Sequence, residues 1–154
     1  MRKLWVMIGR VTFWLVWPLL WLYLKRGKRT RVLLHHKNEI LLVRGWLSSG
    51  KWSLPGGGLH SGEDPKQGAL RELKEETGIT KTNADLHLLG SGSSNQYGLA
   101  FSYYAFAIAC GVKPKLKLQK HEIIDAWWFP VHSITPDLVE RSTLDVLANW
   151  QQSS

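Results

Sequence analysis

The feature that most constrains the fold of this chain is a short helix whose two ends are both marked. Asp64 is a good N-cap, Pro65 suits the first helical position, and Gln67 stands where a capping box needs it. Gly78 supplies the left-handed residue at which helices commonly end. The sequence therefore predicts a helix from Asp64 to Thr77.

This helix presents three glutamates on one face. At about 100° per residue, Glu75 lies about 60° to one side of Glu72, and Glu76 lies about 40° to the other. Like charges this close repel, and hard divalent cations with oxygen ligands relieve the repulsion. The pattern favours Mg²⁺, with Arg71 able to orient or neutralise one carboxylate. For the helix alone, a solvated acidic face is the other interpretation.

The remaining elements are strands and one further helix. Apolar runs at 31–36 and 40–46, separated by 37–39, predict a β-hairpin. Further strands are predicted at 85–89, 100–109 and 124–129, and a last helix at 136–150. Strands interleaved with two helices indicate an α/β sandwich around a mixed sheet. The single cysteine, Cys110, excludes a disulfide framework and is expected to be buried.

The net charge of +8 is concentrated at the N-terminus. Residues 1–31 hold eight of the 20 Lys and Arg side chains and no acid, whereas residues 32–154 are formally neutral. Basic side chains beside an apolar segment are typical of contact with anionic lipid headgroups, so we expect a lipid partner through residues 1–31 and no nucleic acid. The sequence thus divides into an N-terminal segment, 1–29, and a domain, 30–154.

The N-terminal segment has the composition of a membrane helix. Residues 4–24 carry one charge, Arg10, and as a helix would span roughly 30 Å, the hydrocarbon thickness of a bilayer. Five cations at 25–31 predict that the following domain faces the cytoplasm. Trp14, Trp17 and Trp21 share a stripe with Arg10, which also suits a helix lying flat at the interface. A spanning helix, an interfacial helix and a helix folded onto its own domain are all compatible with these residues.

Residues 57–79 match a known pattern, G-x5-E-x7-R-E-U-x-E-E-x-G-U with U aliphatic, at every constrained position. These positions are Gly57, Glu63, Arg71, Glu72, Leu73, Glu75, Glu76, Gly78 and Ile79. This segment resembles the box of the Nudix hydrolases, and the flanking segments 51–58 and 126–130 are also similar to that family. The resemblance covers residues 30–150 and implies a Nudix-type α/β/α sandwich, here preceded by an N-terminal apolar helix.

The resemblance implies a pyrophosphohydrolase that uses Mg²⁺ or Mn²⁺. Such enzymes cleave the phosphoanhydride bond of a nucleoside diphosphate linked to another moiety, by water attack at phosphorus. It implies that Glu72 is a metal ligand or the base, and that Arg71 orients it. The other implied metal ligands are the carbonyl of Gly56 and the side chains of Glu63, Glu75, Glu76 and, outside the box, Glu122, with Asp125 as a second choice for that last position.

The nucleotide is not specified by the sequence. Trp52 and Tyr103 are candidate stacking faces for a base, although aromatic residues in strands more often pack in a core. The main hypothesis is a hydrolase of nucleotide-type diphosphates at the cytoplasmic face of the cell membrane. Two alternatives stay open, a catalytically silent Nudix module that binds a nucleotide or a partner at the membrane, and a hydrolase of a lipid-linked diphosphate.

Overall fold

The computed structural model describes residues 7–8, 11–12, 15, 27–46, 48, 50–96, 99–119 and 122–153. From residue 27 onward, these residues form five strands and two α-helices, joined in part by 3₁₀ turns at Asn83–Asp85 and Val131–Ser133. The order is β1 Lys28–His36, β2 Glu39–Gly45, α2 Pro65–Thr77, β3 His87–Gln96, β4 Leu99–Ala109, β5 Ile123–Pro130 and α3 Arg141–Ser153.

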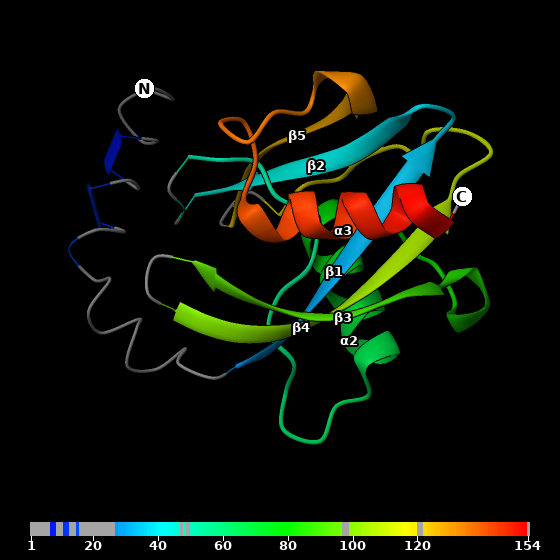
Figure 1. Cartoon of the computed structure of the whole chain (residues 1–154), viewed down its shortest axis with the longest axis horizontal. Coiled ribbons are helices and arrows are strands. Elements are labelled where there is room, and N and C mark those ends of the chain that lie inside the picture. Colours follow the sequence, from blue (N-terminus) through cyan, green and yellow to red (C-terminus); the bar gives the residue numbers. More distant parts are fainter. Residues whose placement is uncertain are drawn as a thin grey trace.

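The strands form one mixed sheet between the two helices. Its order is β3-β4-β1-β2-β5. β1 and β4 run parallel, and the other neighbours are antiparallel. In Figure 1, α3 crosses in front of the sheet and α2 lies behind it. The predicted α/β/α sandwich and the predicted hairpin of β1 and β2 are therefore confirmed.

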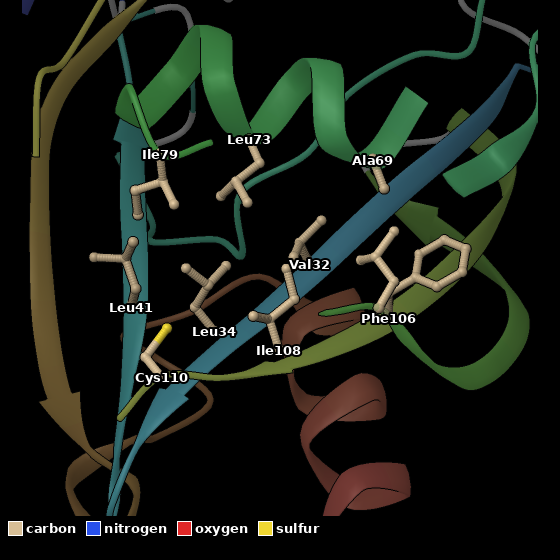
Figure 2. Packing of buried hydrophobic residues seen from close by; sticks show 10 residues of the cluster. Val32, Leu34, Leu41, Ala69, Leu73, Ile79, Phe106, Ile108 and Cys110 are labelled. Carbon is tan, nitrogen blue, oxygen red and sulfur yellow. The ribbon is translucent and has the colours of Figure 1, made fainter. Parts of the chain in front are cut away.

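Each helix closes its own hydrophobic core against the sheet. Alternate residues of β1 point to opposite faces, so Val32 and Leu34 pack under α2, whereas Leu33 packs under α3. Figure 2 shows the α2 side, where Ala69 and Leu73 of the helix meet the strands. Cys110 is buried in this core, as predicted. The core under α2 fixes this helix, and with it the acidic face, on β1.

Asp64 and Gly78 flank α2 as the sequence predicts, and the described N-cap bonds are those of Asp64, not of the Gln67 side chain. The Asp64 carboxylate accepts hydrogen bonds from the backbone N–H groups of Lys66 (3.0 Å) and Gln67 (3.2 Å). At the other end, Gly78 has a φ of +73°, and its N–H donates to the carbonyl of Lys74 at 2.9 Å. These bonds satisfy backbone groups that the first and last turns leave free.

We expect Asp64→Ala to destabilise the protein by about 1 kcal/mol, because two cap bonds are lost. For a chain of this size the midpoint of thermal unfolding should fall by about 3 °C, measurable by differential scanning fluorimetry. Asp64→Asn retains an acceptor at the cap and should keep most of the stability. Equal losses in the two variants would contradict a capping role.

Two predicted boundaries were wrong. The last helix begins at Arg141 and not at 136, because the preceding backbone pairs with Trp52 instead. Trp52 N–H donates to the carbonyl of Leu138 (3.0 Å), and Glu140 N–H donates to the carbonyl of Trp52 (2.9 Å). The strand predicted at 85–89 runs from His87 to Gln96, because its polar second half pairs with β4.

The described positions before residue 27 are Met7, Ile8, Val11, Thr12 and Leu15, all of them helical. The other residues of the predicted apolar helix lie outside the described residues. So do residues 25 and 26, the first two of the basic cluster at 25–31. No helix in the described part of the chain is both long enough and apolar enough to cross a membrane.

Candidate active site

A glycine-rich loop lies along the first residues of β1 and forms one wall of the site. Thr30 N–H donates to the carbonyl of Gly57, and Leu59 N–H donates to the carbonyl of Lys28, both at 2.9 Å. Gly56 has a φ of +139°, and a Cβ there would lie 2.2 Å from the Thr30 carbonyl oxygen. Only glycine fits this position, because both the backbone conformation and the space exclude a side chain.

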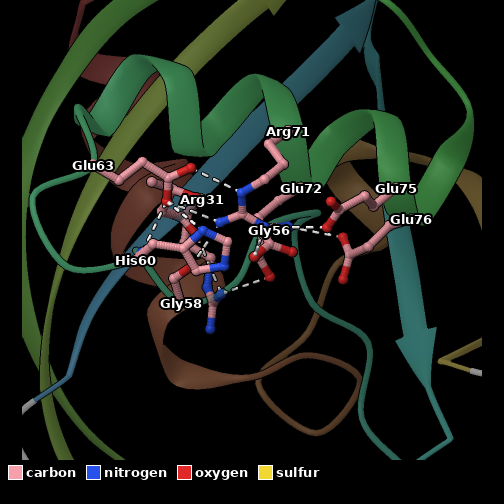
Figure 3. Close-up of polar contacts among 10 residues, drawn as sticks. Arg31, Gly56, Gly58, His60, Glu63, Arg71, Glu72, Glu75 and Glu76 are labelled. Carbon is pink, nitrogen blue, oxygen red and sulfur yellow. Dashed lines mark hydrogen bonds and ion pairs between the residues drawn. The ribbon is translucent and has the colours of Figure 1, made fainter.

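The same loop touches two carboxylates of α2. The backbone N–H of Gly56 donates to Glu76 Oε2 at 2.9 Å. A Cβ on Gly57 would lie 2.6 to 2.7 Å from the carboxyl atoms of Glu72, so this carboxylate packs directly on the loop. Figure 3 shows Glu72 and Glu76 reaching from the helix toward Gly56. The loop and the helix therefore define the position of both side chains.

Arg71 binds the remaining acids of the box. Its guanidinium forms a bidentate pair with Glu63, through Nε to Oε1 (2.8 Å) and Nη2 to Oε2 (3.0 Å). Nη1 donates to Glu72 Oε1 (2.8 Å) and to Glu75 Oε2 (3.1 Å), and Nη2 also donates to the carbonyl of Gly58 (2.9 Å). One cation thus orients three carboxylates and the loop (Figure 3).

The charges of Glu63 and Arg71 stabilise each other. The hydrogen bonds from Arg71 and from the His60 backbone N–H lower the pKa of Glu63 to about 2. The bond to Glu63 is also the largest effect on Arg71, whose pKa is raised. Glu63 is therefore a carboxylate across the physiological range and serves as the anchor of Arg71.

Glu72 and Glu76 are in the opposite electrostatic situation. Burial raises the pKa of Glu76 to about 8; the Gly56 N–H opposes this shift, while the charges of Glu72 and Glu122 add to it. Burial also raises the pKa of Glu72, against the effect of Arg71, and the charges of Glu75 and Glu122 raise it further. Two partly buried acids that resist ionisation next to each other are a favourable place for a cation.

The oxygen atoms at this site are of the kind that binds a hard divalent cation. Carboxylate and carbonyl oxygens are the ligands that Mg²⁺ and Mn²⁺ prefer, and Glu72, Glu76 and the carbonyl of Gly56 belong to the same small region. In the part of the chain that the structure describes, no three acidic, histidine or cysteine side chains converge into a ready-made metal cage.

Of the two acids considered outside the box, Glu122 is the one whose charge acts on the cluster. Glu122 is exposed just before β5, and its charge raises the pKa of both Glu72 and Glu76. Asp125 instead forms a half-buried ion pair with Arg44. The first choice from the sequence therefore has an electrostatic connection to the site.

The two aromatic candidates lie apart from the carboxylates. Tyr103 is 3% exposed and packs in the core under α3, as strand aromatics usually do. Trp52 is half-buried, edge-on to Phe129 with ring centroids 4.9 Å apart, and the Arg44 guanidinium lies 4.9 Å from the Trp52 ring centroid. Both rings are thus engaged in packing within the protein.

Sequence reasoning missed Arg29 and Arg31, which it counted among the basic residues of the N-terminal segment. Both belong to β1. Arg31 Nη1 donates to the carbonyl of Gly56 at 3.3 Å, and the guanidinium groups of Arg29 and Arg31 lie 4.8 Å and 5.8 Å from the centroid of the Phe101 ring. Strand alternation, which aligns Arg29 and Arg31 with Leu33, is a signal that could have put both arginines on one face of β1.

Comparison with known proteins identifies the family of the chain. A family model described as the NUDIX domain matches residues 25–150. The RNA pyrophosphohydrolase of Rhizobium meliloti (strain 1021) is 36% identical over 107 residues, covering 57% of this chain and 64% of that protein. Nudix hydrolase 6 of Arabidopsis thaliana is also 36% identical over 107 residues, covering 65% and 37%. The chain thus spans less than two thirds of the length of either relative.

Solved structures share the fold at lower sequence identity. The NUDIX domain of Shewanella oneidensis NrtR complexed with ADP ribose has a TM-score of 0.70 and 18% identity, over 83% of this chain and 88% of that one. The Francisella tularensis NMN adenylyltransferase/ADP ribose pyrophosphatase, complexed with AMP and a Mn ion, has a TM-score of 0.74 and 17% identity, over 95% and 48%. The family model covers the loop, α2 and the sheet that carries them, and the chain therefore belongs to the Nudix family.

Proposed function

We propose that this chain is a metal-dependent pyrophosphohydrolase that cleaves the phosphoanhydride bond of a nucleoside diphosphate linked to another moiety. The observation that carries the proposal is the pair of partly buried carboxylates, Glu72 and Glu76, held against the glycine loop. Burial raises the pKa of both carboxyl groups, so a cation beside them would stabilise their charged forms. The relatives include an RNA pyrophosphohydrolase, whose name denotes a reaction of the same class.

The metal in this proposal is Mg²⁺ or Mn²⁺, since Nudix hydrolases generally depend on divalent cations. Glu72, Glu75, Glu76 and the Gly56 carbonyl would hold it, with Glu63 and Glu122 assisting. A cation there supplies charge neutralisation for the diphosphate and lowers the pKa of bound water.

The chain's own part is to position the base and keep its orientation. Glu72 would be either a ligand of the cation or the base that accepts the proton of the attacking water, since its carboxylate packs on the loop beside Gly57, next to Glu76. Arg71 is a positioning residue, since it fixes Glu72 through Nη1 at 2.8 Å while Glu63 fixes its other edge. The hydrogen bonds between Glu63 and Arg71 and between Arg71 and Glu72 thus connect the loop to Glu72.

The proposal is tested by an activity screen on the full chain with Mg²⁺ or Mn²⁺. The panel contains ADP-ribose, a dinucleoside polyphosphate, 5′-triphosphorylated RNA and a lipid-linked diphosphate, with phosphate-containing products separated by ion-exchange chromatography. We expect turnover that disappears in Glu75→Gln and persists in Glu39→Gln, a matched change at a half-buried acid paired with Lys113. No product with any substrate would contradict the proposal and favour a silent binding module. Equal product in all three proteins would contradict the role of Glu75.

The neighbouring glycines of the loop provide a matched pair of variants. Gly57→Ala should lower kcat by about 10-fold or more, because its Cβ would displace the Glu72 carboxylate. Gly58→Ala meets no atom within 4 Å and should retain nearly full activity. Steady-state kinetics on the same substrate check this difference, and equal activities would show that Glu72 does not depend on the loop.

We also propose that residues 1–31 attach the domain, residues 30–154, to the cytoplasmic face of the cell membrane. The support is the single charge in residues 4–24 and the adjacent cations Lys25, Arg26 and Lys28, whereas Arg29 and Arg31 belong to the site. After carbonate extraction, retention in the membrane pellet indicates a spanning helix. Release combined with binding to anionic vesicles indicates an interfacial helix. Release without vesicle binding would contradict the attachment.

If the segment serves to reach a lipid-linked diphosphate, deletion of residues 1–24 should reduce turnover of that substrate alone. Unchanged turnover would assign the activity to nucleotides in solution.

A further inference from the structure

We propose that Arg29 and Arg31 form an anion subsite beside the carboxylate cluster, which binds a phosphate group of the substrate next to the one that is attacked. That the bound anion is a substrate phosphate rests on the proposed function. Its geometry and its charge are argued from the described residues.

The arginines and the carboxylates lie on two sides of the same short loop. Arg31 Nη1 donates to the carbonyl of Gly56 at 3.3 Å, and the N–H of Gly56 donates to Glu76 at 2.9 Å. Arg29 is paired with Gly58 in an antiparallel bridge. Figure 3 shows Arg31 and the glutamates of α2 gathered around Gly56 and Gly58. A diphosphate over this loop would therefore meet the carboxylate centre at one phosphate and the arginines at the other.

The arginine pair carries more positive charge than its surroundings neutralise. Arg31 is nearly buried, and its nearest carboxylate, that of Glu140, lies 3.9 Å away. Within the described ranges, Arg31 Nε has no hydrogen-bond partner. Arg29 likewise has no carboxylate at ion-pair distance in that part of the chain, and it shares the ring of Phe101 with Arg31. The two cations thus share one ion-paired acid, Glu140, while the charge of Glu72 acts on Arg29 from the other side of the loop.

Placing two guanidinium groups together out of water is unfavourable unless an anion joins them. Burial and the charge of Arg31 lower the pKa of Arg29 to about 10, which reflects this cost. Phosphate matches the need, because its oxygens accept the paired N–H groups of a guanidinium. The charge of Glu72 acts on Arg29 and that of Arg31 acts on Glu76, so the two halves of the site lie within electrostatic reach of each other.

The test uses methylenediphosphonate, a diphosphate analogue that cannot be hydrolysed, and the metal-free full chain. Without metal the carboxylates repel the analogue, so its binding depends on the arginines. By isothermal titration calorimetry, we expect Arg29→Gln to weaken binding by about 10- to 100-fold, the value of a charge-assisted hydrogen-bond pair. Arg141→Gln is the matched control, since Arg141 is 77% exposed on α3, and it should bind as the wild type does.

Thermal unfolding separates a binding role from a structural one. Without ligand, Arg29→Gln should be at least as stable as the wild type, because a repulsive pair is removed, and the analogue should raise its unfolding midpoint less. Arg31→Lys keeps the charge but not the paired N–H groups, and should also bind more weakly. Absence of analogue binding to the wild type, unchanged affinity in Arg29→Gln, or an equal loss in Arg141→Gln would overturn the subsite.

The outcome is separable from that of the proposed function. Arginine-dependent binding without turnover of any substrate would leave the subsite and overturn the hydrolase. Metal-dependent turnover, together with an unchanged affinity of Arg29→Gln for the analogue, would support the hydrolase and overturn the subsite.

Discussion

Glu76→Gln is expected to remove nearly all hydrolytic activity and, at the same time, to stabilise the metal-free protein. A metal ion contributes several kcal/mol to such a reaction, so loss of one ligand should lower kcat by about 100-fold or more. Stability should rise because Gln keeps the acceptor for the Gly56 N–H without a buried charge. Steady-state kinetics and thermal unfolding of the same preparation check both effects.

The stability gain depends on pH in a defined direction. The pKa of the Glu76 carboxyl is about 8 in the folded protein, above the ordinary value of 4.5 that applies when the chain unfolds. The destabilisation of the wild type is thus absent below pH 4.5, grows as the pH rises toward 8, and is complete above 8. The difference in unfolding midpoint between Glu76→Gln and the wild type should therefore increase over this interval.

Added Mg²⁺ should reverse the order, because it stabilises only the protein that retains the ligand. Glu39→Gln, which removes an acid paired with Lys113 at 2.5 Å, is the control and should change neither property by much. A Glu76→Gln protein that is fully active, or that is less stable than the wild type at pH 8.5 without metal, would contradict this description of the site.

Arg71→Gln should reduce both stability and activity. Arg71 donates to Glu63, Glu72 and Glu75, and its loss leaves three carboxylates close together without their shared cation. Hydrogen bonds to charged groups contribute about 1.5–3 kcal/mol, so a loss of about 2 kcal/mol is expected, or roughly 4–8 °C in the unfolding midpoint. Misplacement of Glu72 should lower kcat by about 100-fold.

Acid titration gives a second signature of Arg71. The pKa of Glu63, about 2 in the folded protein, is below the ordinary 4.5. Its contribution to stability is therefore present above pH 4.5 and is lost as the pH falls toward 2. In Arg71→Gln, the fall in stability between pH 4.5 and 2 should be much smaller than in the wild type. Arg141→Gln, at an exposed position, should show the same fall as the wild type. Equal unfolding midpoints of Arg71→Gln and the wild type at all pH values would contradict the anchoring role.

Local signals in the sequence predicted the parts of the site that belong to one continuous segment. The cap at Asp64, the stop at Gly78 and the shared arc of Glu72, Glu75 and Glu76 all follow from spacing along one helix, and the structure has α2 at Pro65–Thr77. The hairpin of β1 and β2 was likewise predicted because its apolar runs are adjacent in the chain.

Features that depend on distant segments were missed. The second half of β3 has no strand-forming side chains, and its conformation comes from pairing with β4. The start of α3 depends on Trp52, almost 90 residues earlier. Arg29 and Arg31 were interpreted by their position in a basic run, because only the pairing of β1 with the glycine loop brings them to Gly56 and Gly58.

Hydrolysis in water enriched with ¹⁸O tests the central claim most directly. The full chain is incubated with Mg²⁺ and a nucleoside diphosphate derivative, and the products are analysed by mass spectrometry. The proposed mechanism predicts one ¹⁸O atom in a phosphate-containing product, formed by the wild type and not by Glu76→Gln. Product formed at the same rate without a divalent cation, product without ¹⁸O on phosphorus, or the same yield from Glu76→Gln would contradict it.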